Sequence, residues 1–66
     1  MKNNIRVERA ILRMTQAQLA ERIGVSRQTI NAIEAAKYVP STVLALKMSE
    51  IFGKPVNEFF QLEDDD

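Results

Sequence analysis

The sequence predicts an all-α domain, a compact bundle of five helices, and three observations favour this fold class. Apolar residues recur every three or four positions through most of the chain, which is the spacing of amphipathic helices. Hydroxyl side chains suited to helix N-caps precede these segments, and a glycine follows two of them. With 66 residues the chain makes one domain at most, near the lower size limit for folding alone.

The first helix is predicted from Ile5 to Leu12. Ile5, Arg9 and Leu12 lie on one stripe of this helix. A second apolar stripe lies on another side: Val7, Ile11 and Met14. We therefore expect the first helix to contact neighbouring elements on two faces.

Residues 15–34 predict two short helices separated by a single glycine. Thr15 and Gln18 form the Thr-x-x-Gln capping box of the first of these helices, and Gly24 ends it as a residue that tolerates positive φ. Ser26 caps the second. The apolar positions of the pair form its buried side: Leu19, Ala20, Ile23, Val25, Ile30 and Ile33. This arrangement is typical of a helix-turn-helix.

A fourth helix is predicted to open at Pro40-Ser41 and to end at Gly53. Its inward side is apolar: Leu44, Ala45, Met48, Ile51 and Phe52. A turn follows, and residues 57–60 are predicted to form a short last helix. The two ends of the chain leave an alternative open, in which residues 2–3 and 61–63 pair as a short two-stranded sheet joining the termini.

The formal net charge is zero, but the charges are unevenly distributed along the chain. Residues 63–66 hold four of the nine acidic residues, so residues 1–62 carry nine basic and five acidic side chains. We therefore divide the chain into a basic domain, residues 1–62, and an acidic tail, residues 63–66. A domain with surplus positive charge suits a polyanionic partner. The tail is either simply solvated or lowers non-specific affinity for such a partner by repulsion.

The composition excludes several kinds of site and gives no support for catalysis. The chain has no cysteine and no histidine, so disulfides, thiolate metal sites and imidazole chemistry are excluded. No glycine-rich phosphate loop occurs, and glutamates are scattered over the predicted helix surfaces: Glu8, Glu21, Glu50 and Glu58. We expect a protein that is not an enzyme and has no cofactor or metal. No apolar run reaches ~20 residues and no signal-peptide pattern opens the chain, so we expect a soluble, cytoplasmic protein.

A set of residues spread from Ile5 to Phe60 carries a family resemblance: Arg9, Thr15-Gln16, Leu19-Ala20, Ile23-Gly24-Val25-Ser26, Ile30, Ile33-Glu34, Lys37, Pro40-Ser41, Leu44-Ala45 and Phe59-Phe60. On these residues the chain resembles the small Cro/C1-type helix-turn-helix regulators, the group of the phage repressors and the xenobiotic-response-element family. The resemblance implies a lambda-repressor-like domain with its helix-turn-helix at residues 15–34. It also implies a homodimer that binds double-stranded operator DNA and regulates transcription, most simply as a repressor.

The resemblance places the helix that follows Ser26 in the major groove of DNA. Arginine can donate two hydrogen bonds to guanine and glutamine can pair with adenine, so Arg27 and Gln28 are the expected base readers, with Asn31 and Ala32 beside them. Contacts to the DNA backbone are expected from five other residues: Gln16, Ser26, Thr29, Lys37 and Tyr38. For all of these the alternative is an ordinary solvated position or, for the hydroxyl residues, a local cap.

Two further groups of residues have structural roles. Arg9 and Glu34 match positions that form a buried ion pair in the phage-repressor relatives, and we expect them to be partners because burying either charge alone is costly. The expected dimer contact consists of apolar residues near the C-terminus: Ile51, Phe59, Phe60 and Leu62. The alternative is that one Phe fills the core while the other lies exposed.

Three positions depart from the family pattern. Ala35-Ala36 stands where relatives often have Asn-Gly, so a left-handed turn there strains Ala36 by ~1 kcal/mol. Glu8 stands where many relatives have Leu or Ile, and Arg13 replaces a frequent Gly.

A second function stays open beside DNA binding. The same bundle would serve as an antitoxin-like or adaptor module that binds a protein through its apolar end, with DNA binding secondary. The placement of Arg27 and Lys37 around the third helix favours DNA.

Overall fold

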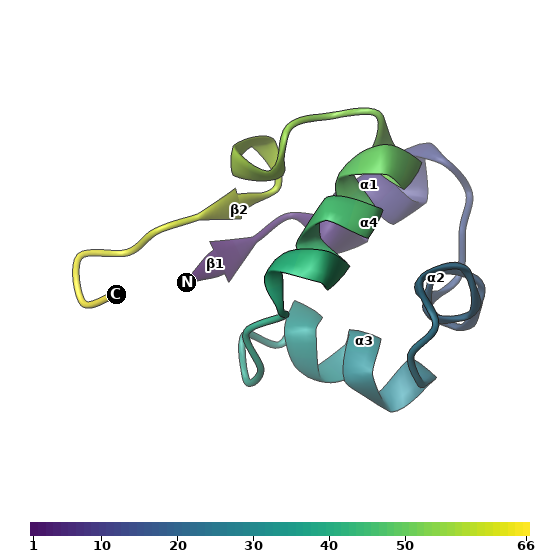
Figure 1. Ribbon diagram of the computed structural model, residues 1–66, viewed down its shortest axis with the longest axis horizontal. Coiled ribbons are helices and arrows are strands. Elements are labelled where there is room, and N and C mark those ends of the chain that lie inside the picture. The colour runs from purple at the N-terminus through teal and green to yellow at the C-terminus, as the bar shows by residue number, and fades with distance from the viewer.

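The computed structural model describes residues 1–66 as four α-helices, one 3₁₀ turn and a two-stranded sheet. The elements in chain order are β1 (Lys2–Asn3), α1 (Ile5–Ile11), α2 (Gln16–Ile23), α3 (Arg27–Glu34), α4 (Thr42–Phe52), η1 (Val56–Glu58) and β2 (Phe60–Gln61). In Figure 1, α4 lies in front of α1, α3 runs along the bottom, and α2 is at the end opposite the two termini.

The prediction of a fifth helix is wrong, because residues 57–58 end the 3₁₀ turn η1, Phe59 follows it, and Phe60 begins the strand β2. Phe60 is extended because it pairs with Asn3 across an antiparallel sheet, and Gln61 pairs with Lys2 in the same way. The alternative of a sheet joining the termini is thus confirmed, with a shorter second strand than expected. Residues 62–63, which we expected in that strand, lie beyond it.

Side-chain caps determine where α2 and α3 begin. The hydroxyl of Thr15 accepts a hydrogen bond from the amide of Gln18 at 3.0 Å, and the Gln18 side chain accepts from the amide of Thr15 at 2.8 Å, which completes the predicted capping box. Gly24 ends α2 with a φ of 76°. The hydroxyl of Ser26 accepts from the amide of Thr29 at 3.1 Å and starts α3. A short, capped turn therefore joins the two helices.

The core lies among the helices and η1 and contains eleven buried apolar residues: Ile5, Met14, Leu19, Ala20, Ile23, Ile30, Ile33, Met48, Phe52, Phe59 and Phe60. Phe52 and Phe59 meet edge to face with ring centroids 5.0 Å apart, and the Phe60 ring lies 5.2 Å from that of Phe59. The segment that follows η1 therefore closes the core with the rings of Phe59 and Phe60.

Helix α1 packs through one face and not through two. Val7 and Ile11 are 56% and 62% exposed, so the expected second contact face is wrong. Glu8, which we expected on the surface, is buried, and its carboxylate lies 2.9 Å from the ammonium group of Lys54. Lys54 follows α4, and its charge is what makes a carboxylate tolerable on the inward face of α1.

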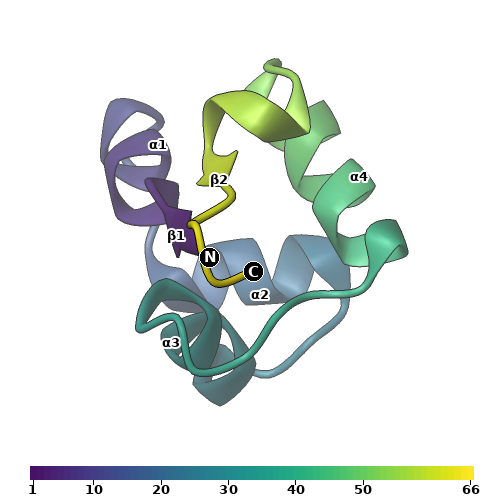
Figure 2. The same ribbon diagram turned by 90° about the vertical axis from the view of Figure 1, so that its left-hand side faces the viewer.

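The two ends of the chain meet. The Met1 ammonium group lies 3.0 Å from the carboxylates of both Glu63 and Asp66. The side-chain amide of Asn3 donates to the carbonyl of Ile33 at 2.9 Å, which ties β1 to the last turn of α3. In Figure 2 the two ends lie in front of the bundle with α2 behind them. None of the helices combines the length and the apolar character that crossing a membrane requires.

Candidate nucleic-acid interface

A polar hollow lies between the first turn of α2 and the first turns of α3. It has a volume of about 250 Å³ and is lined only by polar side chains: Gln16, Arg27, Gln28 and Asn31. All four are among the residues that the sequence predicted to contact DNA. The fold brings three expected base readers together with one expected backbone contact, and each of the three readers is exposed.

The remaining predicted residues of α3 are more enclosed. Ala32 and Thr29 are half-buried. The hydroxyls of Ser26 and Thr29 lie 3.0 Å apart and bond to each other, and Ser26 also caps the helix. These two side chains therefore hold the amino end of α3 in place, which fixes the direction in which Arg27 and Gln28 leave the backbone.

A buried carboxylate connects the hollow to the interior. Glu34, whose side chain is 3% exposed, accepts hydrogen bonds from Arg9 Nε at 2.7 Å and from Arg9 Nη2 at 3.1 Å. Its Oε1 atom also accepts from Gln16 Nε2 at 3.2 Å. The second terminal nitrogen of Arg9, Nη1, donates to the carbonyl of Met14 at 2.9 Å. One acidic side chain at the end of α3 thus binds α1 and the first residue of α2, and its partner Arg9 binds the α1–α2 turn.

The protonation of Glu34 follows from these contacts. Burial opposes its charged form most strongly, yet the hydrogen bonds from Arg9 and Gln16 and the positive charge of Arg9 outweigh that cost. The pKa of Glu34 is therefore held below its ordinary value. The ion pair is charged at neutral pH and keeps Gln16 at the edge of the polar hollow.

The loop after α3 begins at a fixed turn. Ala36 has a φ of 59°, so it adopts the left-handed conformation that the sequence indicated would be strained. The amide of Lys37 donates to the carbonyl of Ala32 at 2.9 Å, which closes the turn. Lys37 and Tyr38 are both exposed beyond it. Lys37 and Tyr38 therefore follow the carboxyl end of α3, whereas Arg27 and Gln28 lie in its first turn.

The expected dimer residues are mostly inside the protein. Phe59 is fully buried and Phe60 is 6% exposed, so neither the expected Phe59–Phe60 contact surface nor the alternative of one exposed Phe is correct. Ile51 is half-buried and packs against the core. Leu62 alone of the four is exposed. The physical reason is the size of the domain, since a core of eleven residues needs both rings to close it.

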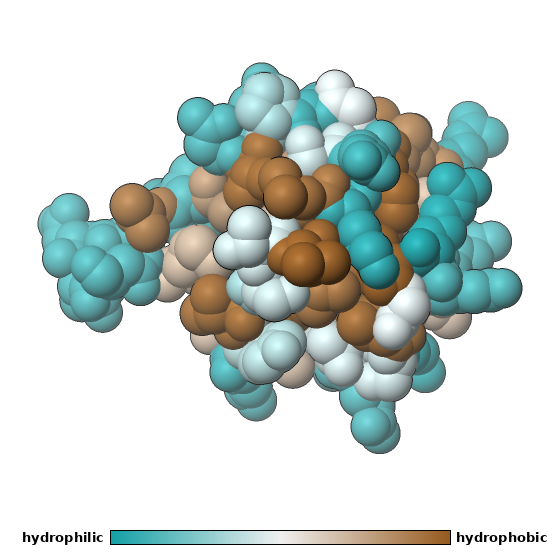
Figure 3. All heavy atoms as spheres, viewed as in Figure 1, coloured by the Kyte–Doolittle hydropathy of each residue, from teal (hydrophilic) through white to brown (hydrophobic).

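A different apolar surface is exposed instead. Figure 3 shows apolar side chains gathered over α4 in the centre of the view. The large exposed ones in and before this helix are Val39, Val43 and Leu46. Val39 and Leu46 also border a hollow of about 260 Å³ with Phe60 among its lining residues. Sequence reasoning missed this surface, although a helix that is apolar on all sides, as residues 43–46 are, was the available signal.

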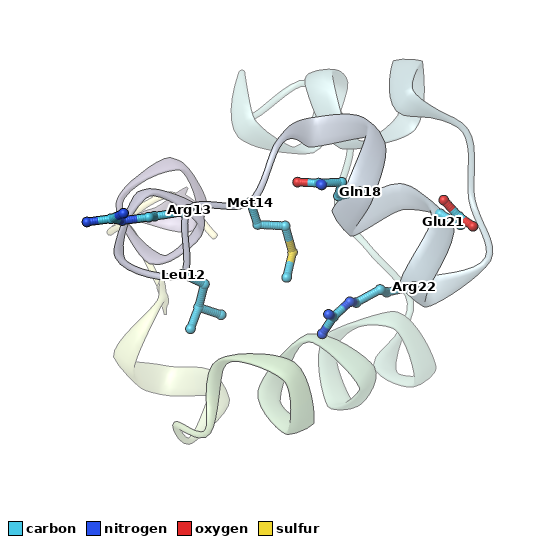
Figure 4. A pocket seen from close by; sticks show the side chains of 6 residues that line it. All are labelled: Leu12, Arg13, Met14, Gln18, Glu21 and Arg22. Carbon is cyan, nitrogen blue, oxygen red and sulfur yellow. The ribbon is translucent and has the colours of Figure 1, made fainter.

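Another hollow lies along a different face of α2 and contains none of the predicted site residues. It has a volume of about 520 Å³ and six lining residues: Leu12, Arg13, Met14, Gln18, Glu21 and Arg22. Figure 4 shows Leu12 and Arg22 pointing toward its interior, while Arg13 points away. Since this hollow shares no residue with the polar hollow, Arg22 is an exposed arginine away from the candidate interface.

Comparison with known proteins agrees with this geometry. A family model described as helix-turn-helix matches residues 5–59. A protein of Methanocaldococcus jannaschii called an uncharacterized HTH-type transcriptional regulator is 48% identical over 66 residues, covering all of both chains. A Bacillus subtilis protein with the same description is 43% identical over 65 residues, covering 98% of each chain, and one of Methanothermobacter thermautotrophicus is 42% identical over 66 residues, covering 98% of this chain and 96% of its own.

The match covers α1 to η1, including the capped turn between α2 and α3 and the polar hollow beside it. The chain belongs to the Cro/C1-type helix-turn-helix family, a family of DNA-binding transcriptional regulators and not of enzymes.

Proposed function

We propose that the protein is a sequence-specific transcriptional regulator that binds duplex operator DNA as a homodimer, with α3 in the major groove, and that it represses transcription by occluding a promoter. The observation that carries this proposal is the polar hollow, in which Gln16 of α2 lies beside Arg27, Gln28 and Asn31 of α3. In a helix-turn-helix the first turns of the second helix contact base edges. These are the turns on which the three exposed polar residues lie.

Sequence discrimination in this proposal comes from the amino end of α3. Arg27 has the donor geometry for the O6 and N7 atoms of guanine, and the amide of Gln28 or Asn31 matches the N6 and N7 atoms of adenine. Each good bidentate contact contributes about 1–3 kcal/mol of discrimination. Ala32 offers only a methyl group, which suits a thymine methyl.

Affinity in this proposal comes from the DNA backbone. Gln16 is the first residue of α2, where free backbone amides and the helix dipole favour a phosphate. Lys37 and Tyr38 stand at the other end of α3 and would contact the backbone there. Ser26 and Thr29 are proposed as lesser contacts, because their hydroxyls already bond to each other.

The dimer contact we propose is the exposed apolar surface of Val39, Val43 and Leu46, and Leu62, which is also exposed, remains a candidate contact. The hollow bordered by Val39 and Leu46 would accept an apolar side chain from a second copy, since the same patch on both copies makes a two-fold contact. Two α3 helices related by this axis would read half-sites about one helical turn, ~34 Å, apart.

The same surface favours a second candidate function, that of an adaptor whose apolar hollow binds another protein. Selection from a pool of random duplexes at 100 mM salt, roughly physiological, separates the two. We expect enrichment of a pseudo-palindromic motif whose half-site spacing reports the dimer geometry. Recovery of a random pool would count against the regulator and in favour of the adaptor.

A further inference from the structure

Arg6 lies beside the polar hollow, although no sequence pattern singled it out. Its side chain is 80% exposed, and its Nε atom lies 3.7 Å from Oε1 of Glu34. The same oxygen accepts the hydrogen bond from Gln16 at 3.2 Å. Because the Arg6 and Gln16 nitrogens approach one oxygen atom, the two side chains are neighbours on the surface. The first turn of α1 therefore reaches the edge of the candidate interface.

Glu34 does not need Arg6 for charge balance. Arg9 already provides one positive charge and two hydrogen bonds to this carboxylate, at 2.7 Å and 3.1 Å. The Arg6 side chain makes no hydrogen bond, and an ion pair this long and this exposed contributes little to stability. Arg6 is thus a surplus cation held next to Gln16, with its guanidinium N–H groups free to donate.

From this juxtaposition we infer that Arg6 binds a backbone phosphate of the DNA next to the phosphate that Gln16 contacts. The inference rests on the proposed function, and it adds α1 to the elements that touch DNA. A guanidinium group matches the oxygens of a phosphate with two parallel hydrogen bonds. The side-chain amide of Gln16 donates one hydrogen to Glu34, and its second hydrogen can donate to the same stretch of the DNA backbone.

The position of Arg6 indicates a phosphate and not a base. The polar hollow is lined by Gln16 and by residues of α3, and Arg6 is not among them. It approaches Glu34, the last residue of α3, whereas Arg27 and Gln28 lie in the first turn of that helix. A contact to phosphate carries no sequence information, and its contribution weakens with added salt.

The test compares wild type, Arg6→Ala, Arg6→Lys and Arg22→Ala. Binding of each full-length protein to the selected duplex and to an unrelated duplex is measured by fluorescence anisotropy over a range of salt. We expect Arg6→Ala to weaken binding to both duplexes by the same factor, roughly 3- to 10-fold, and to reduce the slope of log K against log salt by about 0.9. Arg6→Lys keeps its charge and should keep the slope, and Arg22→Ala should bind as wild type does.

Each other outcome overturns the inference in a recognisable way. An unchanged slope for Arg6→Ala means that Arg6 does not contact phosphate. A loss confined to the selected duplex means that it reads bases, and an equal loss in Arg22→Ala means that only net charge matters. A melting temperature that falls with the affinity indicates a structural role in the Glu34 cluster. If wild type binds neither duplex at low salt, the proposed function fails, and the inference fails with it.

Discussion

The side-chain amide of Gln16 donates to the carboxylate of Glu34 at 3.2 Å, and this bond joins the first residue of α2 to the last residue of α3. The two residues stand at the outer ends of the helix-turn-helix, with the capped turn between them. Since Glu34 is also paired with Arg9, the buried ion pair holds the Gln16 side chain in place. The interface is therefore positioned from the interior of the domain.

Replacing Glu34 should affect stability and DNA binding together. Glu34→Gln removes the charge that Arg9 faces, so we expect a loss of about 3 kcal/mol in the free energy of unfolding, because a half-buried guanidinium loses its partner. Affinity for every duplex should also fall, because the amide leaves one acceptor oxygen for the three donors of Arg9 and Gln16, which weakens the hold on Gln16. Chemical denaturation and DNA titration measure the two effects. Glu21→Gln, at an exposed position of α2, is the control and should change neither.

The same carboxylate predicts an acid dependence of stability. The folded pKa of Glu34 is lower than the unfolded one, so the unfolded chain binds the extra proton as the pH falls. Stability is therefore fully present above the ordinary pKa of 4.5 and is lost as the pH drops below it toward the folded pKa. Thermal unfolding at a series of pH values should show a flatter decline for Glu34→Gln than for wild type. Parallel curves for the two proteins would contradict the assignment.

Arg27 should determine which sequences bind. Arg27→Ala removes a bidentate base contact from an exposed position, so the free-energy difference between specific and non-specific binding should fall by about 1–3 kcal/mol. The melting temperature should stay the same, because the side chain is exposed. Footprinting of the selected site measures the change. A footprint as sharp as that of wild type would remove Arg27 from the list of readers.

Ala36 offers a stabilising substitution. It adopts a φ of 59°, which residues with a Cβ atom enter at a cost and glycine does not, so Ala36→Gly should raise the free energy of unfolding by about 0.5–1 kcal/mol. The neighbouring Ala35 has a φ of −81° and gives the matched control. Ala35→Gly gains nothing from the backbone and increases the freedom of the unfolded chain, so it should be destabilising. Differential scanning calorimetry distinguishes the two variants by opposite shifts in melting temperature.

The apolar surface over α4 should control self-association. Leu46→Asp places a charge on an exposed position beside the apolar hollow, so we expect a dimer to become a monomer that is still folded. Ile11→Asp, at an equally exposed apolar position on α1, should remain dimeric. Phe60→Asp should unfold the domain, because that ring belongs to the core. Light scattering with circular dichroism reports both properties, and a monomeric wild type would rule out the dimer.

Features that depend on neighbours in sequence could be predicted. The capping box of Thr15, the cap at Ser26 and the glycine that ends α2 each need only a few residues, and all three form as expected. The shared face of Arg27, Gln28 and Asn31 on α3 follows from the same local order, whereas their closeness to Gln16 depends on the packing of α2. Strain at Ala36 was also accessible from the residue type alone.

Features that depend on distant parts of the chain could not be predicted from the sequence. Glu8 is buried because Lys54 reaches it from beyond α4, and nothing near Glu8 indicates that partner. Phe60 is extended because Asn3 pairs with it, so a helical pattern was overruled by a sheet. The closeness of Arg6 to Gln16 is seen only through Glu34, which belongs to another helix. In each case the decisive partner is known only once the fold is known.

The contact between Met1 and the acidic tail suits the domain to circular permutation, in which the helices follow one another in a new order. The Met1 ammonium group lies 3.0 Å from the side-chain carboxylate of Asp66, and the loop of residues 37–41 is exposed over most of its length. A circular permutant that joins the ends through a short flexible linker and opens that loop would preserve all eleven core residues. Its first helix would then be α4, and the reading helix would close the chain.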